Sequence, residues 1–205
     1  MFVYLQQQKN KLIMGIGIKA NRKKIGALLA YLSFRMPNIE LRKLLKITYL
    51  IDERAVMERA FPITWLDYYA WAKGPVAPDV YDIKNGSLND FVNCKKNATD
   101  KWTVSPVKNA EFPILQGMKA FSNYEKTIID SIISQYGNKS SDELTDVTHE
   151  CNSLWFKVVE ENKIDFSKQQ KSVFLIDLNR LNDDSKKEIY EEAFDSVQIQ
   201  AAINS

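Results

Sequence analysis

Hydrophobic residues first recur at regular helical spacing just after residue 20. The apolar positions there follow the i, i+3, i+4, i+7 pattern of one helix face, which predicts a helix over about residues 22–35. These positions are Ile25, Leu28, Leu29 and Leu32. Asn21 is placed to cap this helix, and Pro37 ends it because proline lacks the backbone N–H that a helix needs.

The next segment, about residues 39–56, is apolar over much of its circumference. At 100° per residue its leucines and isoleucines cover an arc of about 160°, which indicates a central helix. They are Leu41, Leu44, Leu45, Ile47 and Ile51. Arg42, Lys43 and Lys46 share the opposite arc, which is typical of a solvated helix face.

Asp52 falls inside the apolar arc of this predicted central helix. An ionised carboxylate buried there needs hydrogen-bond donors, because burial without them would cost several kcal/mol. The first interpretation is a structural acceptor that caps a neighbouring helix or pairs with a lysine or arginine. The second interpretation, a carboxylate that belongs to a functional site, stays open.

An aromatic segment, 63–72, follows a break at Phe61-Pro62. It has no 3.6-residue period, so we expect an extended segment that pairs with residues 101–107 as a small antiparallel β element. Gly74-Pro75 is expected to form a turn in which Gly74 takes a positive φ. A short helix is expected from Pro78, and residues 86–100 are expected to form a polar loop.

The second half of the chain carries clear helix-start signals. Ser122 with Glu125 and Ser140 with Glu143 form capping boxes, and Ser153 can cap a short third helix. Residues 173–178 are a strand candidate, and a last helix is predicted over about residues 184–203. The predicted fold class is therefore mainly α (α+β), as one compact helical domain over residues 19–205 with an N-terminal extension over residues 1–18.

Composition excludes several classes of protein. The 205 residues include 45% apolar residues, two cysteines and one histidine, which argues against a disordered chain, a disulfide scaffold and a multi-zinc protein. No run of 18 apolar residues and no signal peptide is evident, so the cytoplasm is the expected location and no membrane partner is expected. Met14 is an alternative start to Met1.

The net charge of +2 conceals an asymmetry. Residues 1–50 hold 10 basic and 1 acidic side chains, whereas residues 51–205 hold 18 basic and 25 acidic ones. The basic residues of the first segment could together form a cationic face for nucleic acid. They are Lys19, Arg22, Lys23, Lys24, Arg42, Lys43 and Lys46. No helix-turn-helix signature accompanies them, so this use is a lesser alternative.

No catalytic constellation emerges from the sequence. There is no glycine-rich phosphate loop and no Gly-x-Ser-x-Gly elbow. Cys151 lies two residues after His149, which on a helix points the two side chains about 200° apart, and nothing supports a Cys94–His149 pair. We therefore expect no enzyme activity, no metal site and no cofactor, and we interpret His149 first as a hydrogen-bonded structural residue.

Three sequence blocks together resemble the Panacea domain of the SocA-like antitoxin family. The first is Arg42 to Glu53 (RKLLKITYLIDE), the second runs from Pro62 to Tyr81 (PITWLDYYAWAKGPVAPDVY), and the third runs from Glu143 to Trp155 with Thr148-His149 at its centre. The order and spacing agree over about residues 21–160. Ala72 departs from the pattern, since lysine or tyrosine is common there.

The resemblance implies a protein-binding module and not an enzyme. Family members are mostly antitoxins, often carried by phages and mobile elements, and one type presents its toxin to a cytosolic AAA+ protease. It therefore implies a cognate protein toxin as the partner, and leaves open a proteolytic-adaptor role. The alternatives are a phage or mobile-element interaction protein without a toxin, and a nucleic-acid-binding regulator.

The residues that carry the resemblance are the candidate toxin-binding or motif residues. They are Lys43, Lys46, Tyr49, Asp52, Trp65, Tyr68, Trp71, Gly74, Pro75, Val76, Tyr81, Thr148, His149 and Trp155. Exposed members of the set Trp65, Tyr68, Trp71 and Trp102 are candidate interface anchors. Because motif residues shared among members should maintain the scaffold, we expect partner-specific contacts in segments 86–120 and 162–205.

Overall fold

The computed structural model describes residues 21–107 and 119–203, and it shows a mainly helical fold with a small antiparallel β element. The predicted N-terminal extension, Met14 and Lys19 lie outside the described residues. The helices are α2 (Arg22–Arg35), α3 (Leu41–Arg59), α4 (Pro78–Tyr81), α6 (Asn123–Tyr136), α7 (Ser141–Thr148), α8 (Leu154–Glu161) and α9 (Asp184–Ile203). The same described residues also contain the short 3₁₀ helices η1 (Asp82–Asn85) and η2 (Leu178–Leu181).

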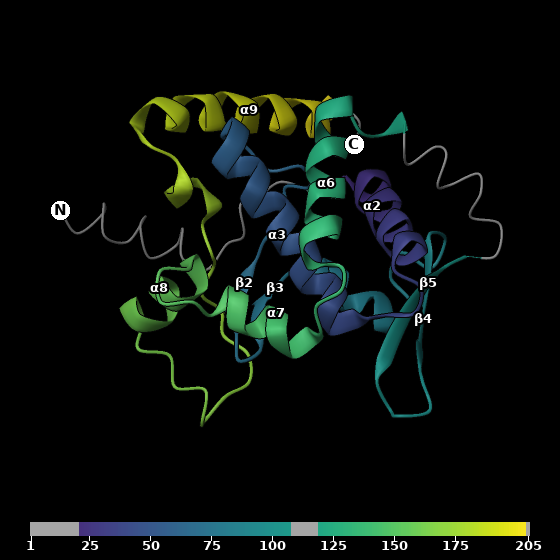
Figure 1. The fold of residues 1–205 in the computed structure, drawn as a ribbon. Coiled ribbons are helices and arrows are strands. Elements are labelled where there is room, and N and C mark those ends of the chain that lie inside the picture. The colour runs from purple at the N-terminus through teal and green to yellow at the C-terminus, as the bar shows by residue number, and fades with distance from the viewer. Residues whose placement is uncertain (1–20, 108–118, 204–205) are drawn as a thin grey trace.

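Helix α3 is the centre of the fold, as its wide apolar arc predicted. It contacts α2, α6, α7, η2 and both small sheets, which surround it in Figure 1. Most of its residues from Leu41 to Asp52 are buried. The helix begins at Leu41, two residues later than predicted, because Ile39 and Glu40 form strand β1 (Ile39–Glu40).

The predicted caps of the later helices are present. Ser122 and Ser140 each form a complete capping box, with Glu125 and Glu143 respectively, and the Ser153 side chain accepts from Phe156 N. Asn21 caps α2 by accepting from Lys24 N. Local sequence therefore sets where these four helices begin.

The predicted pairing of residues 63–72 with 101–107 is wrong. Strand β2 (Tyr69–Trp71) pairs with β3 (Gly74–Val76) as a tight antiparallel hairpin, with Tyr69 opposite Val76. Strand β5 (Trp102–Pro106) pairs instead with β1 and with β4 (Val92–Lys96). The turn Asn97–Asp100 brings β4 and β5 together, since the Asn97 side chain accepts from Thr99 N and Lys101 N.

Two further expectations need correction in detail. Residues 86–100 are not all loop, because β4 occupies 92–96. Residues 173–178 form no regular strand, but this segment borders β2: Ala70 N donates to Phe174 O and Ile176 N to Tyr68 O. The β2–β3 hairpin is thereby extended by backbone hydrogen bonds on its outer edge.

Helix α9 crosses one end of the molecule (Figure 1). Only Tyr190 of this helix is buried, and its ring lies 5.2 Å from the Trp65 ring. Within 21–107 and 119–203, none of the helices has the length and hydrophobicity to cross a bilayer.

Candidate functional site

Asp52 is the best-connected buried side chain of the resemblance motifs. It is fully buried, and its Oδ1 accepts from Ile63 N (2.8 Å) and Thr64 N (2.9 Å). Its Oδ2 accepts from the Thr64 hydroxyl and from Tyr68 Oη (2.8 Å). Burial raises the pKa of the Asp52 carboxyl, and these donors partly offset that rise. Asp52 is therefore a structural acceptor as first interpreted, but it anchors the loop after α3 rather than a helix cap or a cation.

Tyr68 and Tyr49 belong to the same interior cluster. Tyr68 is 1% exposed, and its ring meets the Tyr49 ring edge-on at 5.2 Å. Tyr49 Oη donates to Glu53 (2.8 Å). Burial raises the pKa of both tyrosines well above its usual value. Both hydroxyls are thus neutral donors that hold carboxylates in place, and neither is available as an interface anchor.

Lys46 does not lie on a solvated face, contrary to the prediction. It is 1% exposed, and its Nζ donates to Lys73 O in the turn of the β2–β3 hairpin. Burial, reinforced by the nearby positive charge of Arg42, lowers the pKa of the Lys46 ammonium to about 7. The helical-wheel argument failed because α7 and β3 cover the arc that it assigned to solvent.

Gly74, Thr148 and His149 meet Lys46 at one point. A Cβ on Gly74 would lie 2.5 Å from Lys46 Nζ, 3.0 Å from Thr148 Oγ1 and 3.5 Å from His149 Nε2. Gly74 has the predicted positive φ, at 110°. The hairpin therefore approaches α3 and the end of α7 closely only because residue 74 has no side chain.

His149 is held by stacking. Its ring is parallel to the Trp155 ring with centroids 3.5 Å apart, and Trp155 Nε1 donates to Trp71 O (2.9 Å). Among the described residues, buried His149 Nε2 has no hydrogen-bond partner. Burial, with the Lys46 charge as a second cause, lowers the pKa of the His149 imidazole to about 4, so the ring is neutral at pH 7.

Replacing Gly74 by alanine is expected to lower the free energy of unfolding by about 2 kcal/mol. The cause is twofold, since φ of 110° is strained for an L residue and the new Cβ would press on Lys46 and Thr148. Urea denaturation of both proteins measures the loss.

Gly86→Ala is the matched control for this prediction. Gly86 also has a positive φ, of 94°, but within the described parts of the chain a Cβ on this residue would meet no heavy atom within 4 Å. We expect a loss of about 1 kcal/mol from backbone strain alone. Equal losses for the two variants would contradict the role of close packing at Gly74.

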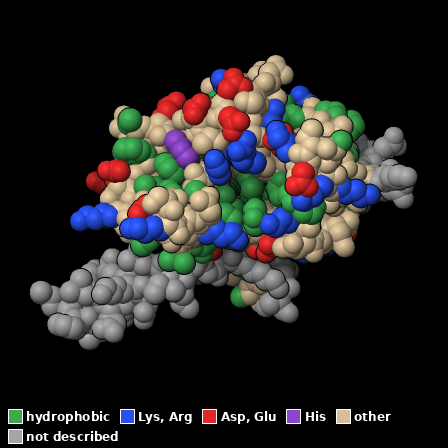
Figure 2. Space-filling model, turned by 90° about the horizontal axis from the view of Figure 1, so that it is seen from below, with side chains coloured by type: hydrophobic (Ala, Val, Ile, Leu, Met, Phe, Trp, Pro, Cys, Tyr) green, Lys and Arg blue, Asp and Glu red, His purple; other side chains and the backbone are tan. Residues whose placement is uncertain are grey.

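An open pocket of about 470 Å³ lies beside this cluster, between the start of α3, the β2–β3 hairpin and the β4–β5 turn. Its apolar lining is Leu41, Leu45, Trp71, Pro75, Val76, Tyr81 and Trp102. Its polar lining is Glu40, Arg42, Lys46, Lys73, Asp100, Lys101, Gln170 and Lys171. Figure 2 shows this face of the molecule, where hydrophobic side chains lie in a hollow with lysine and arginine side chains around it.

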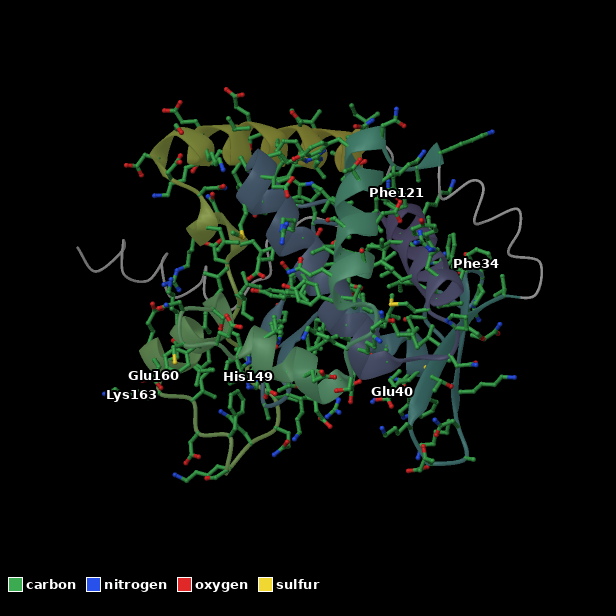
Figure 3. All side chains as sticks on the ribbon, viewed as in Figure 1. Phe34, Glu40, Phe121, His149, Glu160 and Lys163 are labelled. Carbon is green, nitrogen blue, oxygen red and sulfur yellow. The ribbon has the colours of Figure 1, made fainter. Side chains whose placement is uncertain are left out.

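The pocket brings together five of the candidate residues: Lys46, Trp71, Pro75, Val76 and Tyr81. The Trp71 and Tyr81 rings meet edge-on at 5.0 Å. His149 and Glu40 lie on the same side of the molecule, at the end of α7 and the start of α3 (Figure 3). The motif blocks therefore converge in space, with Asp52, Tyr49 and Tyr68 inside the fold and Trp71 and Tyr81 at its surface.

Two candidates lie away from the pocket. Trp65 is 8% exposed and packs against Tyr190 and Phe194 of α9, so it fastens the C-terminal helix and is not an exposed anchor. Lys43 Nζ donates to Gly137 O (2.6 Å) at the end of α6, where a cation also suits the helix dipole. Both residues hold helices together.

Most of the described basic residues of the first segment form ion pairs or hydrogen bonds within the fold. Arg22 pairs with Asp90 (2.6 Å), Lys24 with Glu125 (2.8 Å) and Arg42 with Asp142 (2.6 Å). With Lys46 buried as well, these residues do not form one open cationic face. Among the described residues of the first segment, much of the positive charge is therefore balanced by acidic residues from the rest of the molecule.

Sequence reasoning missed the lysines that border the pocket. Lys73, Lys101 and Lys171 line it, but they come from three separate segments. Lys73 directly precedes the predicted Gly74-Pro75 turn and lies two residues after Trp71. This position was the one local signal that a lysine could lie at the pocket. Lys171 lies 100 residues after Trp71, so no spacing rule could have brought the two together.

Groups that could serve redox or metal chemistry are sparse in the described residues. Burial raises the pKa of the Cys94 thiol to about 11, so the thiol is protonated at pH 7. Across 21–107 and 119–203, no three His, Cys, Asp or Glu side chains are grouped in a way that could hold a metal ion.

Fold and site together define a mainly helical protein with an aromatic, cation-bordered pocket on one face. The family model described as "Antitoxin SocA-like, Panacea domain" matches residues 44–156, more than half of the chain. The chain belongs to this family. Comparison with curated proteins and with solved structures gave no match.

Proposed function

We propose that this chain is the antitoxin of a bacterial or phage toxin–antitoxin pair and neutralises a cognate protein toxin by binding it directly. The family match over residues 44–156 is the observation that carries the proposal. The matched stretch contains both the interior cluster around Asp52 and most of the pocket lining.

The distribution of the motif residues supports a binding role. Asp52 and Tyr68 are held inside the fold by hydrogen bonds, and half-buried His149 is held by stacking, as expected of residues that keep a scaffold in shape. Trp71, Tyr81 and Trp102 are half-buried at the pocket. Large aromatic side chains that are partly exposed at a concave site are the usual anchors of protein interfaces, which bury about 1,600 Å² in total.

A proteolytic-adaptor role is a second proposal, in which the bound toxin is presented to a AAA+ protease. The end of α9 supports it, because Ile199 and Ile203 are 62% and 78% exposed there. Exposed apolar side chains on one helix are a suitable contact surface for a second protein partner.

Co-expression tests the antitoxin proposal. Each reading frame that flanks the gene is induced in a bacterial host, alone and together with this chain, and growth is recorded. We expect one frame to stop growth alone, growth to return with this chain, and the two purified proteins to co-elute from a sizing column. The absence of any toxic flanking frame, or of rescue, would overturn the proposal and favour an interaction protein without a toxin.

The same cells separate the two modes of neutralisation. After synthesis is blocked, the half-life of the toxin is followed by immunoblot with and without this chain. A shorter half-life in its presence supports the adaptor role. An unchanged half-life with full rescue removes the adaptor role and leaves direct neutralisation in place.

A further inference from the structure

The pocket between α3, the β2–β3 hairpin and the β4–β5 turn has an uneven distribution of charge. Arg42, Lys46, Lys73, Lys101 and Lys171 line it, against the two acids Glu40 and Asp100. Both acids are already paired, Glu40 with Lys101 (2.7 Å) and Asp100 with Lys96 (2.6 Å). Arg42 is paired as well, with Asp142 (2.6 Å), so in the part of the chain that the structure describes the positive charge left without an ion pair at the rim of the pocket comes from Lys73 and Lys171.

Two of the lysines are available to a partner. Lys73 and Lys171 are exposed, and neither occurs in an ion pair in the described portion of the chain. Lys171 Nζ lies over the Trp71 ring at 4.5 Å and the Tyr81 ring at 5.0 Å. An ammonium on two aromatic faces is held in position but still has donors for a carboxylate.

The base of the pocket is apolar. Leu45, Val76 and the two indoles Trp71 and Trp102 contribute to it, and the volume of about 470 Å³ is within the range of sites that enclose one or two large side chains. An apolar centre within a charged rim is also the usual anatomy of a protein interface.

We infer that this pocket is the toxin-docking site, and that it takes an acidic segment of the toxin with one large apolar or aromatic side chain. This inference rests on the proposed antitoxin function. The apolar side chain enters between Trp71, Tyr81 and Trp102, and neighbouring carboxylates of the same segment accept from Lys73 and Lys171. Charge complementarity selects this occupant, because a basic segment would be repelled by the unpaired lysines.

The pocket combines residues from inside and from outside the matched family domain. Lys46, Trp71, Val76 and Tyr81 belong to the matched residues 44–156, whereas Lys171 lies outside them. The base of the pocket is thus built by residues of the matched family domain, and Lys171 of its rim comes from outside the matched stretch.

Charge reversal at the rim tests the inference with the toxin from the co-expression experiment. Lys73→Glu combined with Lys171→Glu is expected to weaken binding of the purified toxin by about 100-fold, roughly tenfold for each lysine. Lys73→Ala with Lys171→Ala is expected to give an intermediate loss. Both positions are exposed, so thermal unfolding of each variant should remain close to that of the unmodified chain, with only a small loss from the Lys171 contacts with Trp71 and Tyr81.

Lys23→Glu combined with Lys163→Glu is the matched control, since it changes the net charge equally. Both lysines are exposed and neither lines the pocket; Lys163 lies at the far edge of the molecule in Figure 3. The control is expected to bind within about threefold of the unmodified chain. Binding of the unmodified chain should also weaken as salt rises from 50 to 500 mM, and the Lys73→Glu/Lys171→Glu variant should lose most of that dependence.

The outcomes separate the two proposals. If the unmodified chain binds and rescues while the Lys73→Glu/Lys171→Glu variant binds equally well, the docking site is elsewhere and only the present inference fails. If control and pocket variants weaken binding equally, the effect is one of net charge and the inference also fails. If the unmodified chain binds no flanking gene product, the antitoxin proposal fails and the inference falls with it.

Discussion

Asp52→Ala is expected to lower the free energy of unfolding by about 4 kcal/mol, enough to unfold a marginally stable domain. The fully buried carboxylate accepts four hydrogen bonds, two of them from the backbone at Ile63 and Thr64. Alanine would leave these donors without an acceptor, and each unsatisfied buried group costs about 1–3 kcal/mol before relaxation. Urea denaturation followed by circular dichroism measures the loss.

Two further variants test whether the loss of stability comes from the lost hydrogen bonds of Asp52. Asp52→Asn keeps an oxygen for the two backbone N–H groups but replaces the acceptor of the Thr64 and Tyr68 hydroxyls by an amide NH₂. We therefore expect about half of the alanine loss. Glu58→Ala removes an exposed carboxylate from the same helix and is expected to cost below about 1 kcal/mol. An alanine variant at position 52 as stable as the Glu58 variant would contradict the anchoring role.

The place of Asp52 in the fold could be predicted because it depends on one helix. The apolar arc of residues 39–56 extends around α3, and a carboxylate inside that arc must be buried and must find donors. The identity of the donors could not be predicted, because Ile63, Thr64 and Tyr68 reach Asp52 only through the course of the loop after α3. Helical periodicity carries no information about that loop.

The strand pairing failed for a similar reason. Aromatic residues at 63–72 and alternation at 101–107 each indicate extended chain, but neither pattern specifies a partner. The actual partner of β2 is β3, which starts at Gly74, and the partner of β5 is β4 in a stretch whose polar residues suggested a loop. Turn geometry at Ala72–Lys73 and at Asn97–Asp100 decides both pairings, and it involves positive φ at Gly74 and Asp100.

The pocket shows the limit of sequence reasoning most clearly. Of the four candidate aromatic anchors, Trp71 and Trp102 are half-buried at the pocket, whereas Trp65 and Tyr68 are buried. All four side chains are large aromatics, so side-chain type does not separate them. Their exposure depends on whether α9 or α3 covers the ring. The lysines around the pocket are ordinary surface residues in the sequence, and only the fold makes them neighbours.

As pH rises from 7 to 9.5, the unmodified chain is expected to gain free energy of unfolding relative to the Lys46→Met variant. Lys46 is buried with a pKa of about 7, whereas an unfolded lysine has the usual value of 10.5. Below pH 7 the ammonium is protonated in both states, and the fold carries the full penalty of its burial. Between pH 7 and 10.5 the unfolded chain binds more protons than the folded chain, so stability rises with pH.

The size of this effect follows from the same pKa difference. One proton of difference corresponds to about 1.4 kcal/mol for each pH unit, and the change over this range is up to about 3 kcal/mol. Methionine has a similar length without a titrating group, so groups that titrate in both proteins cancel in the comparison. His149, with a pKa of about 4, is already neutral throughout this range.

Urea titrations at pH 7, 8, 9 and 9.5 for both proteins give the two stability curves. Lys23→Met, at an exposed position in α2, is the control for the loss of one lysine. Parallel curves for the unmodified chain and Lys46→Met would mean that the ammonium is solvated in solution, and would place the hairpin turn at Lys73 farther from α3. A diverging pair would show that the fold holds Lys46 with a lowered pKa beneath the proposed docking site, so that the charge at the pocket base changes near neutral pH.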